Sequence, residues 1–166
     1  MADVSDNPCG TDGVAHAFDL VLERVIDAAP EAVFRAYTDP ALLAQWFVPA
    51  PWRISDIVIE PRPGGRFNFV MHGPEGERVP NSGVFLDVVP NRRLISTDAF
   101  TPDWRPAGQP FMVAHIELEP TGDGRTRYRA TARHWSREAM DQHVAMGFHE
   151  GWGQVADQLN DLVRTL

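Results

Sequence analysis

The sequence predicts an α+β fold in which an antiparallel sheet curves around one long C-terminal helix. From residue 52 to residue 135, apolar and polar residues alternate in short runs, which is typical of strands with one buried face. Turns rich in glycine and proline separate these runs. Residues 136–164 instead carry apolar residues at helical spacing. Because only this segment is long enough to cover a sheet, we expect it to pack across the concave face.

The first part of the predicted domain contains one strand and two short helices. Residues 18–27 alternate between apolar and polar and predict a strand. Pro30 suits the first turn of a helix, and Asp39 is a good N-cap for a second helix. Residues 1–16 are expected to form a flexible tail, so a single domain is expected over residues 17–166.

Six further strands are predicted, which makes a seven-stranded antiparallel sheet. They cover residues 52–60, 66–72, 83–89, 93–100, 111–120 and 126–135. The Gly-Asp-Gly sequence at 122–124 is a strong signal for a tight turn between the last two strands. The segment 100–110 holds three prolines and a tryptophan and is too long for a hairpin turn. We expect it to form a lid or a rigid crossover.

One continuous helix is predicted from about Ser136, a suitable N-cap, to Arg164. Three glycines lie inside this segment. Gly147 and Gly151 are four residues apart, so in a helix they share one face. Because glycine has no side chain, that face of the helix either leaves space for a ligand or lets the backbone contact the sheet. Our hypothesis is that it leaves space for a ligand. The sequence offers no explanation for Gly153.

Charge and composition exclude several classes of function. The chain has 15 basic and 23 acidic residues, a net charge of -8, which argues against nucleic acid or an anionic membrane as partner. All the basic residues are arginine, which excludes a Schiff-base lysine. No apolar run is long enough to span a membrane, and residues 1–16 lack the features of a secretory signal. We therefore expect a cytoplasmic protein without membrane insertion.

Neither a metal nor a cofactor is expected. Cys9 is the only cysteine and lies in the predicted tail. A single cysteine can form neither an intrachain disulfide nor a thiolate metal cluster. The chain contains no metal-binding HExxH and no GxSxG nucleophile motif. PRPGGRF, at 61–67, lacks the spacing of a phosphate-binding loop and opens a strand, so it predicts a tight turn. The six histidines are at positions 16, 72, 115, 134, 143 and 149.

Three polar side chains are the candidate catalytic residues. Tyr128 and His134 are predicted on the inner face of the last strand, and His143 on the helix is expected to face them. Such a group in an apolar pocket fits acid–base chemistry on an enolisable substrate. The alternative hypothesis is that all three are hydrogen-bonded core residues. Asp98 and Glu117 are expected on solvated faces or rims.

The candidate ligand site consists of side chains on elements that should converge. Aromatic walls with a few polar groups are typical of pockets for flat or lipidic molecules, although an ordinary core has the same composition. The candidate ligand-binding residues are Trp46, Phe67, Phe69, Met71, Tyr128, His134, Met140, His143, Gly147, Phe148, Gly151 and Trp152.

Four stretches resemble a known family. AYTDPALLAQWF, PRPGGRFNFVM, GVFLDVVPNRRLIST and GFHEGWGQVADQL are similar, in this order, to the small AHSA-type START-like proteins related to the activator of heat-shock-protein ATPase. The wider superfamily includes plant pollen allergens, polyketide cyclases and lipid-transfer START domains. The resemblance covers about residues 18–163 and implies the helix-grip fold, with a cavity between sheet and C-terminal helix. Phe47 departs from the pattern, because a second tryptophan is frequent there.

The hypothesis for function is a soluble protein that binds a small hydrophobic or aromatic ligand in the helix–sheet cavity. The first alternative is a polyketide cyclase or aromatase-like enzyme, favoured if Tyr128, His134 and His143 are in hydrogen-bond contact. The second is a chaperone-ATPase-activating interaction module, favoured by a filled core. The resemblance to the eukaryotic co-chaperone concerns its C-terminal part, whereas its N-terminal domain does most of the docking. A homodimer is compatible with the sequence.

Overall fold

The protein is described by a computed structural model that covers residues 18–166, so the predicted tail, 1–16, lies outside the described residues. Its elements, in chain order, are β1 (Asp19–Ile26), α1 (Pro30–Thr38), α2 (Pro40–Leu43), β2 (Arg53–Ile59), β3 (Phe67–His72), β4 (Arg78–Asn81), β5 (Val84–Val89), β6 (Arg93–Thr97), β7 (Phe100–Thr101), the 3-10 helix Pro102–Trp104, β8 (Arg105–Pro106), β9 (Val113–Pro120), β10 (Thr126–Arg133), α3 (Arg137–Ala145) and α4 (Phe148–Val163).

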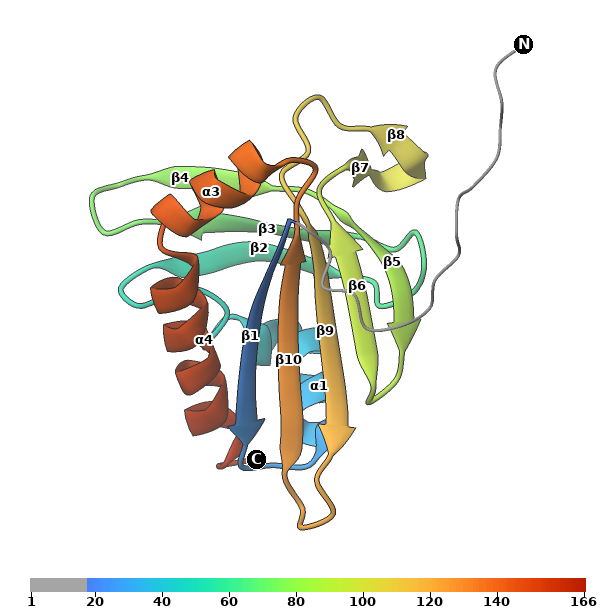
Figure 1. The fold of residues 1–166 in the computed structure, drawn as a ribbon, viewed down its shortest axis with the longest axis vertical. Helices are drawn as coiled ribbons and strands as arrows, with labels where there is room; N and C mark the ends of the chain where they lie inside the picture. The colour runs from blue at the N-terminus through green and yellow to red at the C-terminus, as the bar shows by residue number, and fades with distance from the viewer. Residues whose placement is uncertain (1–17) are drawn as a thin grey trace.

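The strands form two main sheets, and every strand pair among the described residues is antiparallel, as predicted. Five strands stand upright in the order β1-β10-β9-β6-β5, and β2-β3-β4 run across behind them (Figure 1). The predicted single seven-stranded sheet is therefore divided, and β4 and the β7-β8 hairpin are additional strands. The α+β class and the sheet packed against C-terminal helices are confirmed.

The two sheets are joined where β3 begins and β5 begins. The amide of Phe67 donates to the carbonyl of Gly83 at 3.0 Å, and the amide of Phe85 donates to that of Gly65 at 2.9 Å. A Cβ atom at Gly65 would lie 1.9 Å from the carbonyl oxygen of Glu60, so no other residue fits this close approach. The PGG sequence is thus a tight turn, as predicted, and it positions β3 against the rest of the fold.

The core lies between the two sheets and is closed by helices. In Figure 1, α1 lies behind β9 and β10, and α4 runs beside β1. On β10 the inward residues Tyr128, Ala130 and Ala132 are buried, whereas Arg127 and Arg129 are exposed, which confirms the predicted alternation. On α4 the buried positions recur at helical spacing, at Phe148, Gly153, Ala156, Leu159 and Val163.

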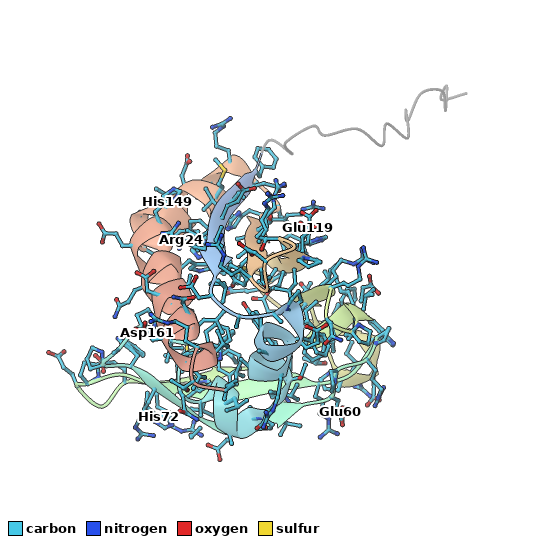
Figure 2. The ribbon with its side chains drawn as sticks, turned by 90° about the horizontal axis from the view of Figure 1, so that it is seen from below. Arg24, Glu60, His72, Glu119, His149 and Asp161 are labelled. Atoms are coloured by element: carbon cyan, nitrogen blue, oxygen red, sulfur yellow. The ribbon has the colours of Figure 1, made fainter. Side chains whose placement is uncertain are left out.

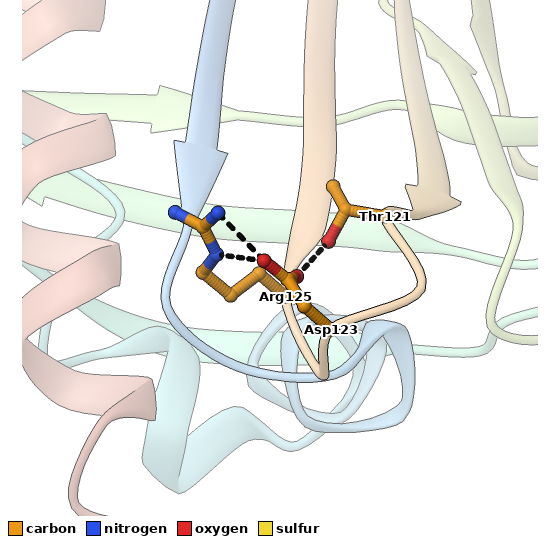
Figure 3. A network of polar contacts seen from close by, with 3 residues as sticks. All are labelled: Thr121, Asp123 and Arg125. Atoms are coloured by element: carbon orange, nitrogen blue, oxygen red, sulfur yellow. Dashed lines mark hydrogen bonds and ion pairs between the residues drawn. The ribbon is translucent and has the colours of Figure 1, made fainter.

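Local signals placed several boundaries correctly. The Asp39 carboxylate accepts from the amide of Ala41 at 2.9 Å and caps α2. The Ser136 hydroxyl accepts from the amide of Ala139 at 3.1 Å and caps α3. The turn between β9 and β10 is closed by Asp123, which pairs with Arg125 at 2.7 Å and accepts from the Thr121 hydroxyl (Figure 3). The hydrogen bonds from Arg125 and then Thr121 lower the pKa of Asp123 well below its usual range.

The prediction of one continuous C-terminal helix is wrong, because the helix breaks at Gly147. This residue has φ 92° and ψ 37°, a left-handed conformation that a right-handed helix cannot contain. Glycine adopts it without steric cost. The break separates α3 from α4 and lets α3 turn over the upper end of the sheets (Figure 1).

The segment 100–110 forms a small hairpin instead of an extended lid. Strands β7 and β8 pair on either side of the 3-10 helix and project from the top of the molecule (Figure 1). None of the helices described over residues 18–166 combines the length and hydrophobicity that crossing a membrane requires.

Candidate functional site

Two buried polar pairs lie inside the fold, each surrounded by aromatic rings. The first joins the hydroxyl groups of Tyr37 on α1 and Tyr128 on β10 at 2.6 Å. Burial raises the pKa of Tyr128 to about 12 and raises that of Tyr37 well above its ordinary value. Both hydroxyls therefore stay protonated at neutral pH, so neither tyrosine supplies a base.

The rings around this pair form what we call the tyrosine cluster, which contains Tyr37, Trp46, Phe47, Phe67, Phe69, Phe85 and Tyr128. Trp46 lies 4.7 Å from Tyr37, ring centre to ring centre, and its indole donates to the carbonyl of Ala36 at 3.1 Å. Phe47 contacts the rings on β3, with its ring centre 5.6 Å from that of Phe67. Since the polar groups at its centre are paired and buried, this cluster is built as core.

The second pair joins His134, which follows β10, to His143 on α3. Nε2 of His134 and Nδ1 of His143 are 2.9 Å apart, and Nδ1 of His134 lies 2.9 Å from the carbonyl oxygen of Phe18. Both side chains are buried. Burial, followed by the neighbouring His134, lowers the pKa of His143 to about 4. His143 is therefore neutral at physiological pH.

The rings that contact this pair form the histidine cluster, which consists of Phe111, His134, His143, Phe148 and Trp152. The ring centre of His143 lies 4.8 Å from that of Phe111, 5.1 Å from Phe148 and 5.8 Å from Trp152. Phe148 is buried, but Phe111 and Trp152 are only half-buried. The cluster thus has an apolar side that solvent reaches.

The structure does not bring the three candidate catalytic residues together. Tyr128 and His134 share the inner face of the strand but are six residues apart, which is about 20 Å in a strand. Tyr128 contacts Tyr37 and belongs to the tyrosine cluster with Trp46, Phe67 and Phe69. His134, His143, Phe148 and Trp152 form the other cluster, and the half-buried Met71 and Met140 pack against the core. The predicted site is thus two separate centres.

Gly147 and Gly151 do not bring bare backbone into contact with the sheet. A Cβ at Gly147 would meet nothing within 4 Å, and that residue precedes α4, so it does not stack on Gly151. A Cβ at Gly151 would touch Pro49 at 3.9 Å, an ordinary contact with a loop. The face of α4 that packs on β1 instead contains Gly153, where a Cβ would lie 3.2 Å from the guanidinium of Arg24. Arg24 lies beside α4 in Figure 2.

The two hollows described on residues 18–166 lie outside both clusters. Gln45, Gln158, Asp161, Leu162 and Thr165 line the first. Glu60, Arg62, Pro63, Gly64, Arg66, Pro102, Asp103 and Trp104 line the second. None of the twelve candidate ligand-binding residues lines either. Over the same part of the chain, no three His, Cys, Asp or Glu side chains are arranged to hold a metal ion.

Sequence reasoning missed four residues that shape these centres. Tyr37 and Phe47 were treated as ordinary helix or flanking residues, and Phe111 as a strand end. Asp98, expected on a rim, is half-buried and accepts from the amides of Phe111 at 2.9 Å and Met112 at 3.2 Å. It thereby fixes Phe111 over the histidines. No sequence spacing signals this contact, whereas Tyr37 and Val33 recur at helical spacing, a pattern that indicates one face of a helix.

Comparison with known proteins shows related chains of the same length and fold. The family described as Activator of Hsp90 ATPase homolog 1-like protein matches residues 27–164. The crystal structure of a protein from Nitrosomonas europaea is 46% identical, with a TM-score of 0.87, over 92% of this chain and 97% of that one. A protein from Rhodobacter sphaeroides is 26% identical, with a TM-score of 0.78, over 93% and 97%.

A third structure, the AHSA1 protein from Silicibacter pomeroyi, is 28% identical, with a TM-score of 0.67, over 86% of this chain and 95% of that one. The comparison with curated proteins gave no match. These structures establish the fold.

Proposed function

The chain belongs to the family of Activator of Hsp90 ATPase homolog 1-like proteins, and from that premise we propose that it binds a small hydrophobic or aromatic molecule between the C-terminal helices and the sheet. The family supports a fold of the small-ligand-binding type. The histidine cluster is the place within this fold where the ligand binds. Aromatic rings with one polar group among them are the usual lining of such sites.

The observation that carries this proposal is the half-exposed apolar side of the histidine cluster. Phe111 and Trp152 flank His143 and remain half-buried, and Met140 on α3 is half-buried beside the core. A ligand that covers these side chains gains about 25 cal/mol for each Å² of apolar surface it removes from water. In the tyrosine cluster Phe47, Phe67 and Phe69 are half-buried too, but the two hydroxyl groups of that cluster are hydrogen-bonded to each other.

Ligand entry requires α3 to move, and two features support this. Gly147 connects α3 to α4 through a left-handed residue that a small change in dihedral angles reorients. In addition, α3 buries only His143 of its nine residues. Because the hollows described on the chain lie elsewhere, the ligand space opens when α3 lifts from Phe111 and Trp152.

Native mass spectrometry of protein purified from its own host tests the proposal directly. We expect a co-purified small molecule that is lost on denaturation. In parallel, 2-methoxynaphthalene is titrated against Trp152→Ala and, as matched control, Trp135→Ala, whose indole is 53% exposed and outside the cluster. We expect at least about tenfold weaker binding for Trp152→Ala alone. Equal effects of the two variants would contradict the proposed site.

An interaction module is the second candidate, favoured by the position of the two described hollows, which lie away from the space between helices and sheet. The family name points to a chaperone ATPase as the partner. Stimulation of the host chaperone's ATPase by the purified chain, retained in Trp152→Ala, would support this function over ligand binding. We expect no stimulation.

An acid–base enzyme is favoured only by the hydrogen bond between the two histidines. Tyr128 lies in the other cluster and cannot act with them. If the protein only binds, His134→Gln and His143→Gln alter affinity modestly and remove no turnover. A cyclase activity that disappears in either variant would reverse this ranking.

A further inference from the structure

The hydrogen bonds of the histidine pair determine where the protons of both rings lie. A carbonyl oxygen only accepts, so Nδ1 of His134 carries a proton and donates it to Phe18. The Nε2 atom of neutral His134 is then an acceptor. Its hydrogen bond to His143 therefore uses the Nδ1 proton of His143. In the neutral pair, Nε2 of His143 is left as an unprotonated lone pair.

This lone pair has no hydrogen-bond partner among residues 18–166, and the ring that carries it is 7% exposed. The only fully buried side-chain nitrogen or oxygen without a partner in that part of the chain is Nε of Arg133. Nε2 of His143 is not such an atom. Phe111, Phe148 and Trp152 surround the ring on its other sides. Nε2 of His143 is thus a hydrogen-bond acceptor on a ring that aromatic side chains surround.

We infer that Nε2 of His143 accepts a hydrogen bond from the ligand, and that the ligand is a hydrophobic molecule bearing a hydroxyl group, a phenol above all. The inference rests on the proposed function and adds the chemistry of the ligand to it. A flat ring packs between Phe111 and Trp152 while its hydroxyl donates to His143. A ligand without a donor would cover the lone pair and leave it unpaired, which costs affinity.

The same geometry disfavours acidic ligands. A carboxylate would place its own lone pairs against an unprotonated nitrogen, and its charge would enter an apolar site without a paired cation. The low pKa of His143, caused first by burial, prevents the ring from supplying that cation at neutral pH. The hydroxyl of the ligand also stays neutral, because the lowered pKa of His143 makes its ring too weak a base to take the proton from a phenol.

Three naphthalene probes of nearly equal shape test the inference. 2-Naphthol carries a donor, 2-methoxynaphthalene has none, and 2-naphthoate is anionic. We expect the wild-type protein to bind 2-naphthol about threefold to tenfold more tightly than 2-methoxynaphthalene, the range of one hydrogen bond, and 2-naphthoate most weakly. His143→Phe keeps a ring of similar volume and should abolish the preference for 2-naphthol while binding 2-methoxynaphthalene within about twofold of wild type.

His149→Phe is the matched control. His149 lies two residues into α4 and is exposed, so the preference should persist in this variant (Figure 2). Equal wild-type affinity for 2-naphthol and 2-methoxynaphthalene would overturn this inference and leave the proposed function standing. Failure of all three probes to bind would overturn the proposed function and the inference with it.

Proton-detected ¹⁵N spectra of the wild-type histidine rings test the same point without any variant. We expect His143 in the tautomer that carries its proton on Nδ1, and a shift of the Nε2 signal when 2-naphthol is added but not when 2-methoxynaphthalene is added. A proton on Nε2 of His143 at neutral pH would overturn the inference, even if His143→Phe fails to fold.

Discussion

The two C-terminal helices are attached to the protein in different ways. Helix α4 buries five residues, among them Leu159 and Val163, against the core. It is also fastened by side-chain hydrogen bonds. Gln158 donates to the carbonyls of Trp46 and Val48, both at 2.8 Å, and accepts from the amide of Ala50 at 3.0 Å. Asn160 accepts from the amide of Asp27 at 2.7 Å.

Helix α3 lacks most of these attachments. Its one buried residue is His143, and the hydrogen bond to His134 ties that residue to the end of β10. Val144 and Met146, at the end of the helix, are 42% and 67% exposed. Apolar burial holds an element over a wide range of pH, whereas a single hydrogen bond between histidines is lost on protonation. Helix α4 is thus the more firmly attached of the two, and α3 is the helix that we propose moves when a ligand enters.

The largest expected effect comes from the core of α4. Leu159→Ala leaves a cavity at a side chain with 0% exposure and should lower the free energy of unfolding by about 3 kcal/mol. Val144→Ala on α3 should change it by less than about 0.5 kcal/mol, because that side chain is exposed. Urea denaturation of both variants measures the difference. Similar losses would show that α3 is packed as firmly as α4.

Acid should detach α3 before α4. The pKa of His143 falls from 6.5 to about 4 on folding, so between these values the unfolded chain binds the additional proton. Stability is therefore full above about pH 6.5 and decreases as the pH falls towards 4, by on the order of 2–3 kcal/mol. Amide exchange should quicken first in α3. In His143→Phe this part of the pH dependence should be absent, and an unchanged profile would contradict the assignment.

Substitution of Gly147 should lower stability because of its left-handed backbone conformation and not because of steric crowding. Gly147→Ala forces a side chain into a residue with φ 92° and should cost about 1–2 kcal/mol, although nothing lies within 4 Å of the new Cβ. Gly147→Asn should cost less, since asparagine tolerates left-handed conformations. Thermal melts compare the two. A neutral alanine variant would mean that the break between α3 and α4 is easily lost.

The smallest effect is expected at Gly151, with the opposite sign. This residue lies inside α4, and its new Cβ would touch Pro49 at 3.9 Å, which is ordinary contact. Gly151→Ala should therefore raise stability by up to about 1 kcal/mol through helix propensity. If Gly151→Ala instead lowers the melting temperature, α4 sits closer to the 49–51 loop than described.

The sequence alone determined the features that depend on neighbours in the chain. The caps at Asp39 and Ser136, the turn at 122–124 and the alternation along β10 all follow from local hydrogen bonding and side-chain period. The resemblance in four motifs placed the fold, and the family match confirms it. The candidate ligand residues were chosen because aromatic side chains on inward faces are visible in the pattern, and their role in binding stays a prediction.

Only the tertiary structure decided how those residues divide. Gly147 is compatible with the interior of a helix or with a break between two helices. Which of the two forms depends on how α3 packs so that His143 is buried. His134 and Phe18 are 116 positions apart, and Tyr37 and Tyr128 are 91, so no local rule pairs them. These contacts depend on how elements far apart in the chain pack together. The sequence specified which side chains face inward, and only the packing of distant elements decided which of them meet.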